Sequence, residues 1–265
     1  MPVVGELPGI RSRPRLYRLA TAATVQSSRV IDREVKRLRR RDTEPALMLA
    51  EALARARGNR LDPDELRWVE AIEHGRARQY RSRSAVTWKA GRQVALGRIA
   101  RRASQPRAGG VLLLCLVRAF RPGRALELGT CAGISAAYQG AGLQLNGAGE
   151  LVTLEAYPDL ASHACALWDQ LRLTTVRVAV GRFEATLGDQ LVPKVDYAFV
   201  DGAHHGPRTY AHFRAIADAA RPGALLIFDD IAWSAGMAEA WARIRHDPAV
   251  AEHATTGTVG IVVLG

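Results

Sequence analysis

The chain has 265 residues, of which 48% are hydrophobic and 24% charged. It is long enough for one large domain, or a medium domain with an appendage, and its composition is that of a folded protein. Its three cysteines, Cys115, Cys131 and Cys165, form no CxxC pair, which excludes a disulfide-stapled scaffold, disfavours a zinc knuckle and suggests a reducing compartment. The longest apolar run is too short to span a bilayer, so we expect a soluble, cytoplasmic protein with no membrane partner.

Positive charge is concentrated in the N-terminal part of the chain. The formal net charge is +11; residues 1–110 contain 25 Lys and Arg against 11 Asp and Glu, and residues 111–265 contain 12 against 15. Such a basic region could bind the phosphates of nucleic acid, or it could consist of solvated helix faces. No RNA-binding motif or aromatic interleaving accompanies the charge, which favours the solvated faces.

Residues 1–27 lack clear periodicity, and their arginines could form a basic arm. Three charged helices are then predicted, at 28–41, at 44–57 and from Asp62 towards residue 80, the last with an N-cap Asp and Pro63 at its first position. Residues 81–109 suggest loops around a short helix near 93–101. A buried helix follows at 111–120.

From residue 125 onward, strands alternate with helices. The predicted strands are 125–128, 151–155, 175–180, 195–200 and 224–228, with one or two more within 257–264. The predicted helices are 134–140, 160–171, 209–219 and 238–245. This pattern predicts an α/β fold with a doubly wound, Rossmann-like, mostly parallel sheet of seven strands and an Arg-rich helical N-terminal extension. The expected boundary lies between residues 107 and 108.

A glycine-rich turn follows the first of these strands. The residues from Glu127 to Ser135 read ELGTCAGIS, where glycine allows the backbone to approach a ligand closely. Glu155 ends the next strand, and a carboxylate there can accept hydrogen bonds from both hydroxyls of a ribose. An acid beside the turn suits a cationic ligand better than a pyrophosphate. Alternatively, the turn serves packing, with Glu127 paired to an Arg.

ELGTCAGIS and the later LVTLE, which ends at Glu155, resemble the first two motifs of the class I S-adenosylmethionine-dependent methyltransferases, over about residues 108–265. The resemblance implies S-adenosylmethionine as cofactor and a set of residues that bind it. The methionine side would be lined by Glu127, Gly129, Thr130, Gly133 and Ser135, the ribose would be held by Glu155, and Gly181, Arg182 and Phe183 would lie by the adenine.

Two further strands end in acids: Asp201 follows one, and Asp229 and Asp230 follow the other. In a doubly wound sheet both ends open onto one crevice. Carboxylates gathered there repel one another unless a cation lies between them, and oxygen ligands favour Mg²⁺, Ca²⁺ or Mn²⁺. Alternatively, these acids cap the segments that follow or contact only the cofactor amine.

The 28-residue separation of Asp201 and Asp229, with Asp230 adjacent, resembles the metal-dependent O-methyltransferases of the catechol and macrolide-sugar types. That resemblance implies a metal held by the three acids, and it places Asp201 at the cofactor as well. It also implies that His204 is the general base, as in the macrolide-sugar enzymes; the catechol enzymes use a Lys at this position. His205 and a purely structural His204 are the alternatives. Trp233 could form a wall of the acceptor pocket or belong to the core.

Three functions follow. The first is an O-methyltransferase acting on a hydroxyl or carboxylate oxygen of a small-molecule or peptide natural product, with S-adenosylmethionine and a divalent cation such as Mg²⁺. The second is an RNA methyltransferase whose basic N-terminal region binds phosphates. The third is a non-catalytic partner-binding protein that keeps the fold. The strand-end acids and His204 favour the first. We also expect a homodimer. The N-terminal helices would cover the pocket, bind the acceptor or form the dimer contact.

Overall fold

The computed structural model describes residues 28–88, 91–192, 194–202 and 204–265. The predicted basic arm lies within residues 1–27, outside the described residues. The three predicted N-terminal helices are confirmed as α2 (Ser28–Arg39), α3 (Glu44–Arg57) and α4 (Pro63–Arg81). Asp62 caps α4 by accepting hydrogen bonds from the backbone N–H groups of Asp64 and Glu65, and the Glu65 side chain accepts one from the Asp62 N–H.

The segment after α4 differs from the prediction. The predicted short helix near 93–101 is found as α5 (Leu96–Ala103), but an antiparallel hairpin of β1 (Ala85–Trp88) and β2 (Arg92–Ala95) precedes it where loops were expected. Gly91, in the left-handed region at φ 72°, lies between the two strands. The buried helix begins earlier than predicted, as α6 (Arg107–Phe120), because Pro106 at its N-cap starts the helix before the apolar run begins.

The predicted α/β fold is confirmed. The seven-stranded sheet has the order β5-β4-β3-β6-β7-β9-β8, with β3 to β7 parallel and β9 antiparallel to both of its neighbours. Its strands are β3 (Arg124–Leu128), β4 (Glu150–Glu155), β5 (Val176–Val180), β6 (Val195–Val200), β7 (Ala220–Phe228), β8 (Val250–Thr255) and β9 (Gly260–Leu264). The helices between them are α7 (Ile134–Asn146), α8 (Pro158–Leu171), α9 (Phe183–Gln190), α10 (Gly206–Ala219) and α11 (Ala235–Ile244). α9 and β8 lack predicted counterparts, since the final strands were expected within residues 257–264, where only β9 lies.

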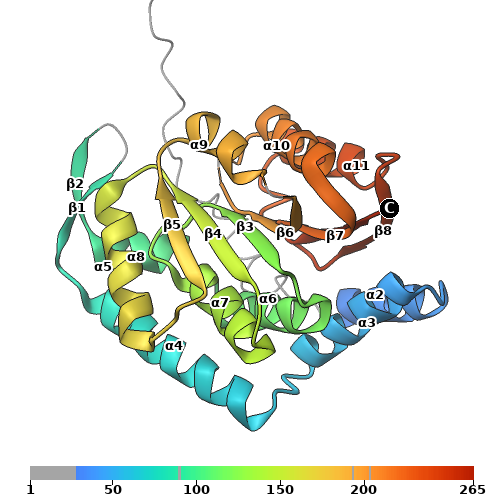
Figure 1. The fold of residues 1–265 in the computed structure, drawn as a ribbon, viewed down its shortest axis with the longest axis horizontal. Coiled ribbons are helices and arrows are strands. Elements are labelled where there is room, and N and C mark those ends of the chain that lie inside the picture. Colours follow the sequence, from blue (N-terminus) through green and yellow to red (C-terminus); the bar gives the residue numbers. More distant parts are fainter. Residues whose placement is uncertain (1–27, 89–90, 193, 203) are drawn as a thin grey trace, which may run out of the picture.

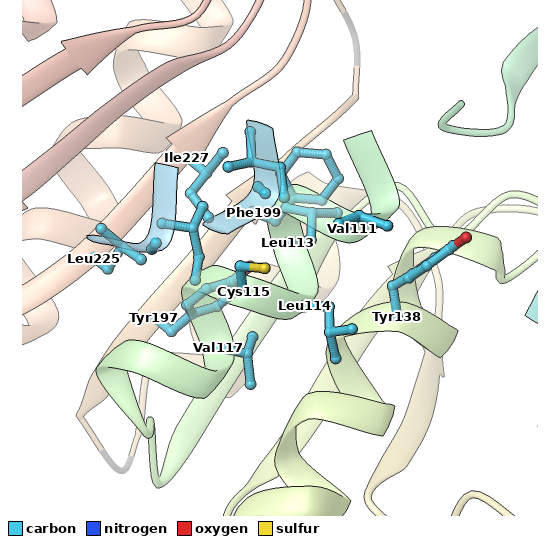
Figure 2. Close-up of a cluster of buried hydrophobic side chains, with 14 of the residues drawn as sticks. Val111, Leu113, Leu114, Cys115, Val117, Tyr138, Tyr197, Phe199, Leu225 and Ile227 are labelled. Atoms are coloured by element: carbon cyan, nitrogen blue, oxygen red, sulfur yellow. The ribbon is translucent and has the colours of Figure 1, made fainter. Parts of the chain in front are cut away.

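Helices cover both faces of the sheet (Figure 1). Alternate residues of β6 and β7 point to opposite faces, as strand geometry requires. Tyr197 and Ile227 pack against α6 on the face that α7 and α8 also cover (Figure 2), whereas Ala198 and Phe228 pack with α10 and α11 on the other face. Figure 2 shows α6 buried between the sheet and Tyr138 of α7. Parallel strands need this double cover.

The N-terminal helices share the first of these cores. Residues of α2, α3 and α4 belong to the same buried hydrophobic cluster as α6 and α7. A buried ion network adds to this contact: the fully buried Glu65 lies 2.6 Å from Arg55 of α3 and 3.2 Å from Arg118 of α6. The boundary at residue 107 stays a prediction. Among the described residues, no helix is both long and apolar enough to cross a membrane.

We predict that Glu65→Ala lowers the free energy of unfolding by about 3 kcal/mol, because it removes the shared partner of two partly buried arginines. Chemical denaturation followed by circular dichroism measures the change. Glu70→Ala is the matched control, since Glu70 is exposed on the same helix. Equal stability of the two variants would show that the network contributes nothing.

Candidate active site

The candidate site lies at the carboxyl edge of the parallel sheet. β3 pairs with β4 on one side and with β6 on the other, so the order of the strands reverses there. Ligands of doubly wound sheets bind at this switch point, outside the carboxyl ends of the strands. The predicted site residues lie at the carboxyl ends of β3 and β4 or in the segments that follow β3, β5, β6 and β7.

The glycine-rich turn after β3 has the close approach that the sequence predicts. Gly129 has φ 114°, and a Cβ there would lie 2.5 Å from the carbonyl oxygen of Asp201. Gly133 has φ 79°, and its Cβ would lie 2.7 Å from that of Ala164 in α8. Only glycine allows both backbone conformations in so little space. The turn therefore lies directly against the segment that carries Asp201.

Glu127 lies inside the protein beneath this turn. Its carboxylate accepts hydrogen bonds from Gln139 at 2.8 Å and from Thr153 at 2.5 Å. Burial raises the pKa of Glu127 to about 7, although hydrogen bonds from Thr153, Ser135 and Gln139 oppose the rise. Its hydrogen-bond partners within the described part of the chain are thus uncharged polar side chains, not the Arg of the alternative. Thr130 is also buried, and its hydroxyl oxygen lies 2.6 Å from the hydroxyl oxygen of Thr153.

Glu155 joins the turn to the end of β4. Its carboxylate accepts hydrogen bonds from the backbone N–H groups of Cys131 at 2.8 Å and Tyr157 at 2.9 Å. Burial is the largest influence on this carboxyl and raises its pKa, against the lowering effect of these backbone donors. Each carboxylate oxygen can accept a second hydrogen bond, so the group retains the capacity to bind a ligand.

The residues predicted to lie by the adenine are adjacent to Glu155. The Gly181 N–H donates to the Glu155 carbonyl at 2.8 Å, and Arg182 is the N-cap of α9. The Phe183 ring occupies the place that a Cβ on Gly202 would need, at 2.5 Å. These residues therefore connect the end of β4 to the segment after Asp201.

Asp201 and Asp229 converge on a residue that the sequence analysis missed. Gln105, which is 7% exposed, donates from Nε2 to Asp201 Oδ2 at 3.2 Å and also to Asp229 Oδ2. The pKa of Asp201 is raised well above its ordinary value, first by burial and then by the charges of Asp229 and Asp230. Gln105 stands alone before Pro106 in a segment without periodicity, so no sequence signal marks it.

Asp230 turns towards His204. It has φ 55°, and its Oδ2 lies 3.5 Å from His204 Nδ1. His204 also has a positive φ of 38°, and its ring stacks on Trp233 with 5.3 Å between the centroids. His205 is exposed and is the N-cap of α10. Trp233 thus lies beside His204, partly exposed, and is not among the buried core residues.

The predicted metal centre is only partly assembled. Within the described ranges, no group of three or more His, Cys, Asp or Glu side chains is arranged to hold a metal ion. Two of the three acids nevertheless face one amide nitrogen, the position in which a cation would balance their charges. The donor set, carboxylate oxygen, is the kind that Mg²⁺ and Mn²⁺ bind. In donor chemistry the acids therefore suit a divalent ion, and the Gln105 amide lies against two of them.

The segment from the end of α4 to Gln105 lies across this edge. Gln79 donates to the Ala132 carbonyl in the glycine-rich turn at 2.8 Å, and the ring of Trp88 lies 5.0 Å from that of Tyr157. The hairpin contacts α8, which follows Glu155 (Figure 1). Two cavities, one of about 410 Å³ beside α2 and α3 and one of about 400 Å³ between α4 and the ends of α7 and α8, are lined by none of the predicted site residues.

Comparisons with known proteins agree with this geometry. Residues 126–231 match a family described as a methyltransferase domain. A search of curated proteins gives no match. Among solved structures, a methyltransferase from Podospora anserina bound to S-adenosylhomocysteine is 19% identical, with 77% of this chain and 89% of that chain covered and a TM-score of 0.58.

Two O-methyltransferases are also similar. One, from Streptomyces achromogenes, is involved in tomaymycin synthesis and was solved with S-adenosylmethionine; it is 23% identical over 62% of this chain and 83% of its own, with a TM-score of 0.52. One from Bacillus cereus, solved with S-adenosylhomocysteine, is 20% identical over 77% and 91%, with a TM-score of 0.52. These likenesses show the fold. The chain thus has the fold of these methyltransferases, and its residues 126–231 match the methyltransferase-domain family.

Proposed function

We propose that the protein is an O-methyltransferase that transfers the methyl group of S-adenosylmethionine to a hydroxyl or carboxylate oxygen of a small-molecule or peptide natural product. The observation that carries this proposal is that the Asp201 backbone lies against Gly129 of the glycine-rich turn, while His204, on the same segment, lies 3.5 Å from Asp230. The Streptomyces relative, which acts in tomaymycin synthesis, supports a natural product as acceptor.

The donor would lie along the turn and Glu155. It supplies a methyl group on a positively charged sulfonium. Gly129, Thr130, Gly133 and Ser135 would surround its methionine part, with the buried Glu127 below them. Glu155 would bind the ribose hydroxyls through the oxygen lone pairs that the Cys131 and Tyr157 N–H groups leave available.

His204 would take the proton of the acceptor. A carboxylate beside Nδ1, here that of Asp230, favours the imidazole tautomer with its hydrogen on Nδ1, so that Nε2 carries the lone pair. Stacking on Trp233 restricts the ring to one plane. The same Trp would then form one wall of the acceptor site.

A divalent ion is part of this proposal. Asp201, Asp229 and Asp230 would hold it, and the ion would lower the pKa of the acceptor hydroxyl. Burial, and after it the charges of Asp229 and Asp230, raise the pKa of Asp201, and a cation among these acids would relieve their repulsion.

RNA is the less favoured acceptor. Several N-terminal arginines are already paired with acids of the protein, for example Arg57 with Asp32 at 2.8 Å, so part of the basic charge is neutralised internally.

The homodimer stays a prediction.

The function is tested with purified protein, methyl-labelled S-adenosylmethionine and two acceptor sets, hydroxylated or carboxylated metabolites and peptides in one and total RNA in the other. We expect label transfer to the first set, loss of transfer in EDTA, and recovery with Mg²⁺. Transfer to RNA alone would contradict the proposal, and transfer that EDTA leaves unchanged would remove the metal from it.

Glu155→Gln is expected to weaken S-adenosylmethionine binding by about tenfold to a hundredfold, because neutral amide groups make weaker hydrogen bonds to the ribose than a carboxylate does. Isothermal titration calorimetry measures the dissociation constant. The control is Glu150→Gln, at the opposite end of the same strand. Unchanged affinity in Glu155→Gln would place the ribose elsewhere.

His204→Gln should lower kcat by about a hundredfold or more, since a general base contributes at least this factor. Donor affinity should remain within about twofold of that of the wild type, because His204 would contact the acceptor. His205→Gln, the neighbouring exposed histidine, is the matched control. If His205→Gln lost activity instead, the two roles would be exchanged.

A further inference from the structure

Gln105 brings the N-terminal half of the chain into the candidate active site. It lies between α5 and α6, directly before Pro106, and a residue that precedes proline is restricted to extended backbone conformations. Its side chain is buried. Its Nε2 donates to Asp201, at the end of β6, and to Asp229, at the end of β7. One amide thus ties together two strand ends that are distant from it in sequence.

The other end of the amide is also placed by its surroundings. A Cβ on Gly109, in the first turn of α6, would lie 2.5 Å from Gln105 Oε1. The carbonyl oxygen therefore occupies space that exists only because residue 109 is glycine. With Oε1 against α6, Nε2 points at the two carboxylates, and the orientation of the amide is defined from both sides.

The amide and a cation would compete for the same position. An amide nitrogen presents two N–H groups, one for each carboxylate. A divalent ion held by Asp201 and Asp229 would need an oxygen of each carboxylate in direct contact, because carboxylates coordinate Mg²⁺ at about 2.1 Å and Ca²⁺ at about 2.3 to 2.6 Å. The amide nitrogen already lies against one oxygen of each, so the two would compete.

We propose that Gln105 is an internal competitor of the divalent cation: its amide occupies the position between Asp201 and Asp229, and an ion binds only when this side chain moves away. Gln105 is thus a positioning residue that sets the metal affinity of the site. This inference rests on the metal part of the proposed function and adds to it the residue that controls occupancy.

The test is Mn²⁺ binding, measured by the electron paramagnetic resonance signal of free Mn²⁺, with the full-length protein. Gln105→Ala should bind Mn²⁺ at least about tenfold more tightly than the wild type, because no side chain then has to be displaced. Gly109→Ala should also bind more tightly, because its methyl group displaces the amide without deleting it. Gln93→Ala, an exposed glutamine of the hairpin, is the matched control and should equal the wild type.

Circular dichroism melting confirms that each variant is folded, and Gly109→Ala keeps the test decisive if Gln105→Ala does not fold. Equal Mn²⁺ affinity in all four proteins, weaker affinity in Gln105→Ala, or no binding in any of them overturns the inference. Methyl transfer measured on the same preparations keeps the two proposals apart: unchanged Mn²⁺ affinity with active enzyme contradicts only the role of Gln105, whereas inactive wild type contradicts the proposed function.

Discussion

The convergence of acidic side chains at the carboxyl edge of the sheet is the constraint on which this site depends. Parallel strands bring their ends to one edge, so Glu155, Asp201 and Asp229 meet there although they lie far apart in the sequence. Like charges in a partly buried place are unfavourable unless each finds a donor or a cation. Backbone N–H groups donate hydrogen bonds to Glu155, and the Gln105 amide donates to the two aspartates.

The N-terminal region is coupled to this edge at both ends. Its helices α2 to α4 share one hydrophobic core with α6 and α7 and are joined to α6 through Glu65. The segment that follows α4 reaches the glycine-rich turn through Gln79 and the aspartate pair through Gln105. Some of the arginines that make this region basic thus form ion pairs within the protein. This explains part of the positive charge in a region that has no nucleic-acid-binding motif.

Most of the fold was accessible from the sequence because the signals were local. The strands read as short apolar runs, and the caps at Asp62 and Pro63 defined α4. The hairpin of β1 and β2 was missed because its strands are four residues each and only Val86 is buried. α9 was missed because only Leu187 is buried in it, so no amphipathic period appears.

The candidate site was predictable only in part. Acids at strand ends follow from the pattern, and the resemblance supplied their proposed roles. The sequence pattern does not reveal which groups these acids contact. Contacts such as that of Gln105 with Asp229 span more than a hundred residues of sequence and depend on how the chain packs. The predicted three-acid cluster likewise separates into a pair that faces Gln105 and an Asp230 that faces His204.

Residues 79–88 and 91–105 lie along the edge that carries the candidate site. Gln79 contacts the glycine-rich turn, the Trp88 ring lies beside that of Tyr157, and Gln105 contacts the aspartate pair. Under the proposed function, exchange of the donor and entry of the acceptor would both disturb contacts made by this one stretch of chain. The rate at which it opens would then bear on turnover as well as the rate of the chemical step.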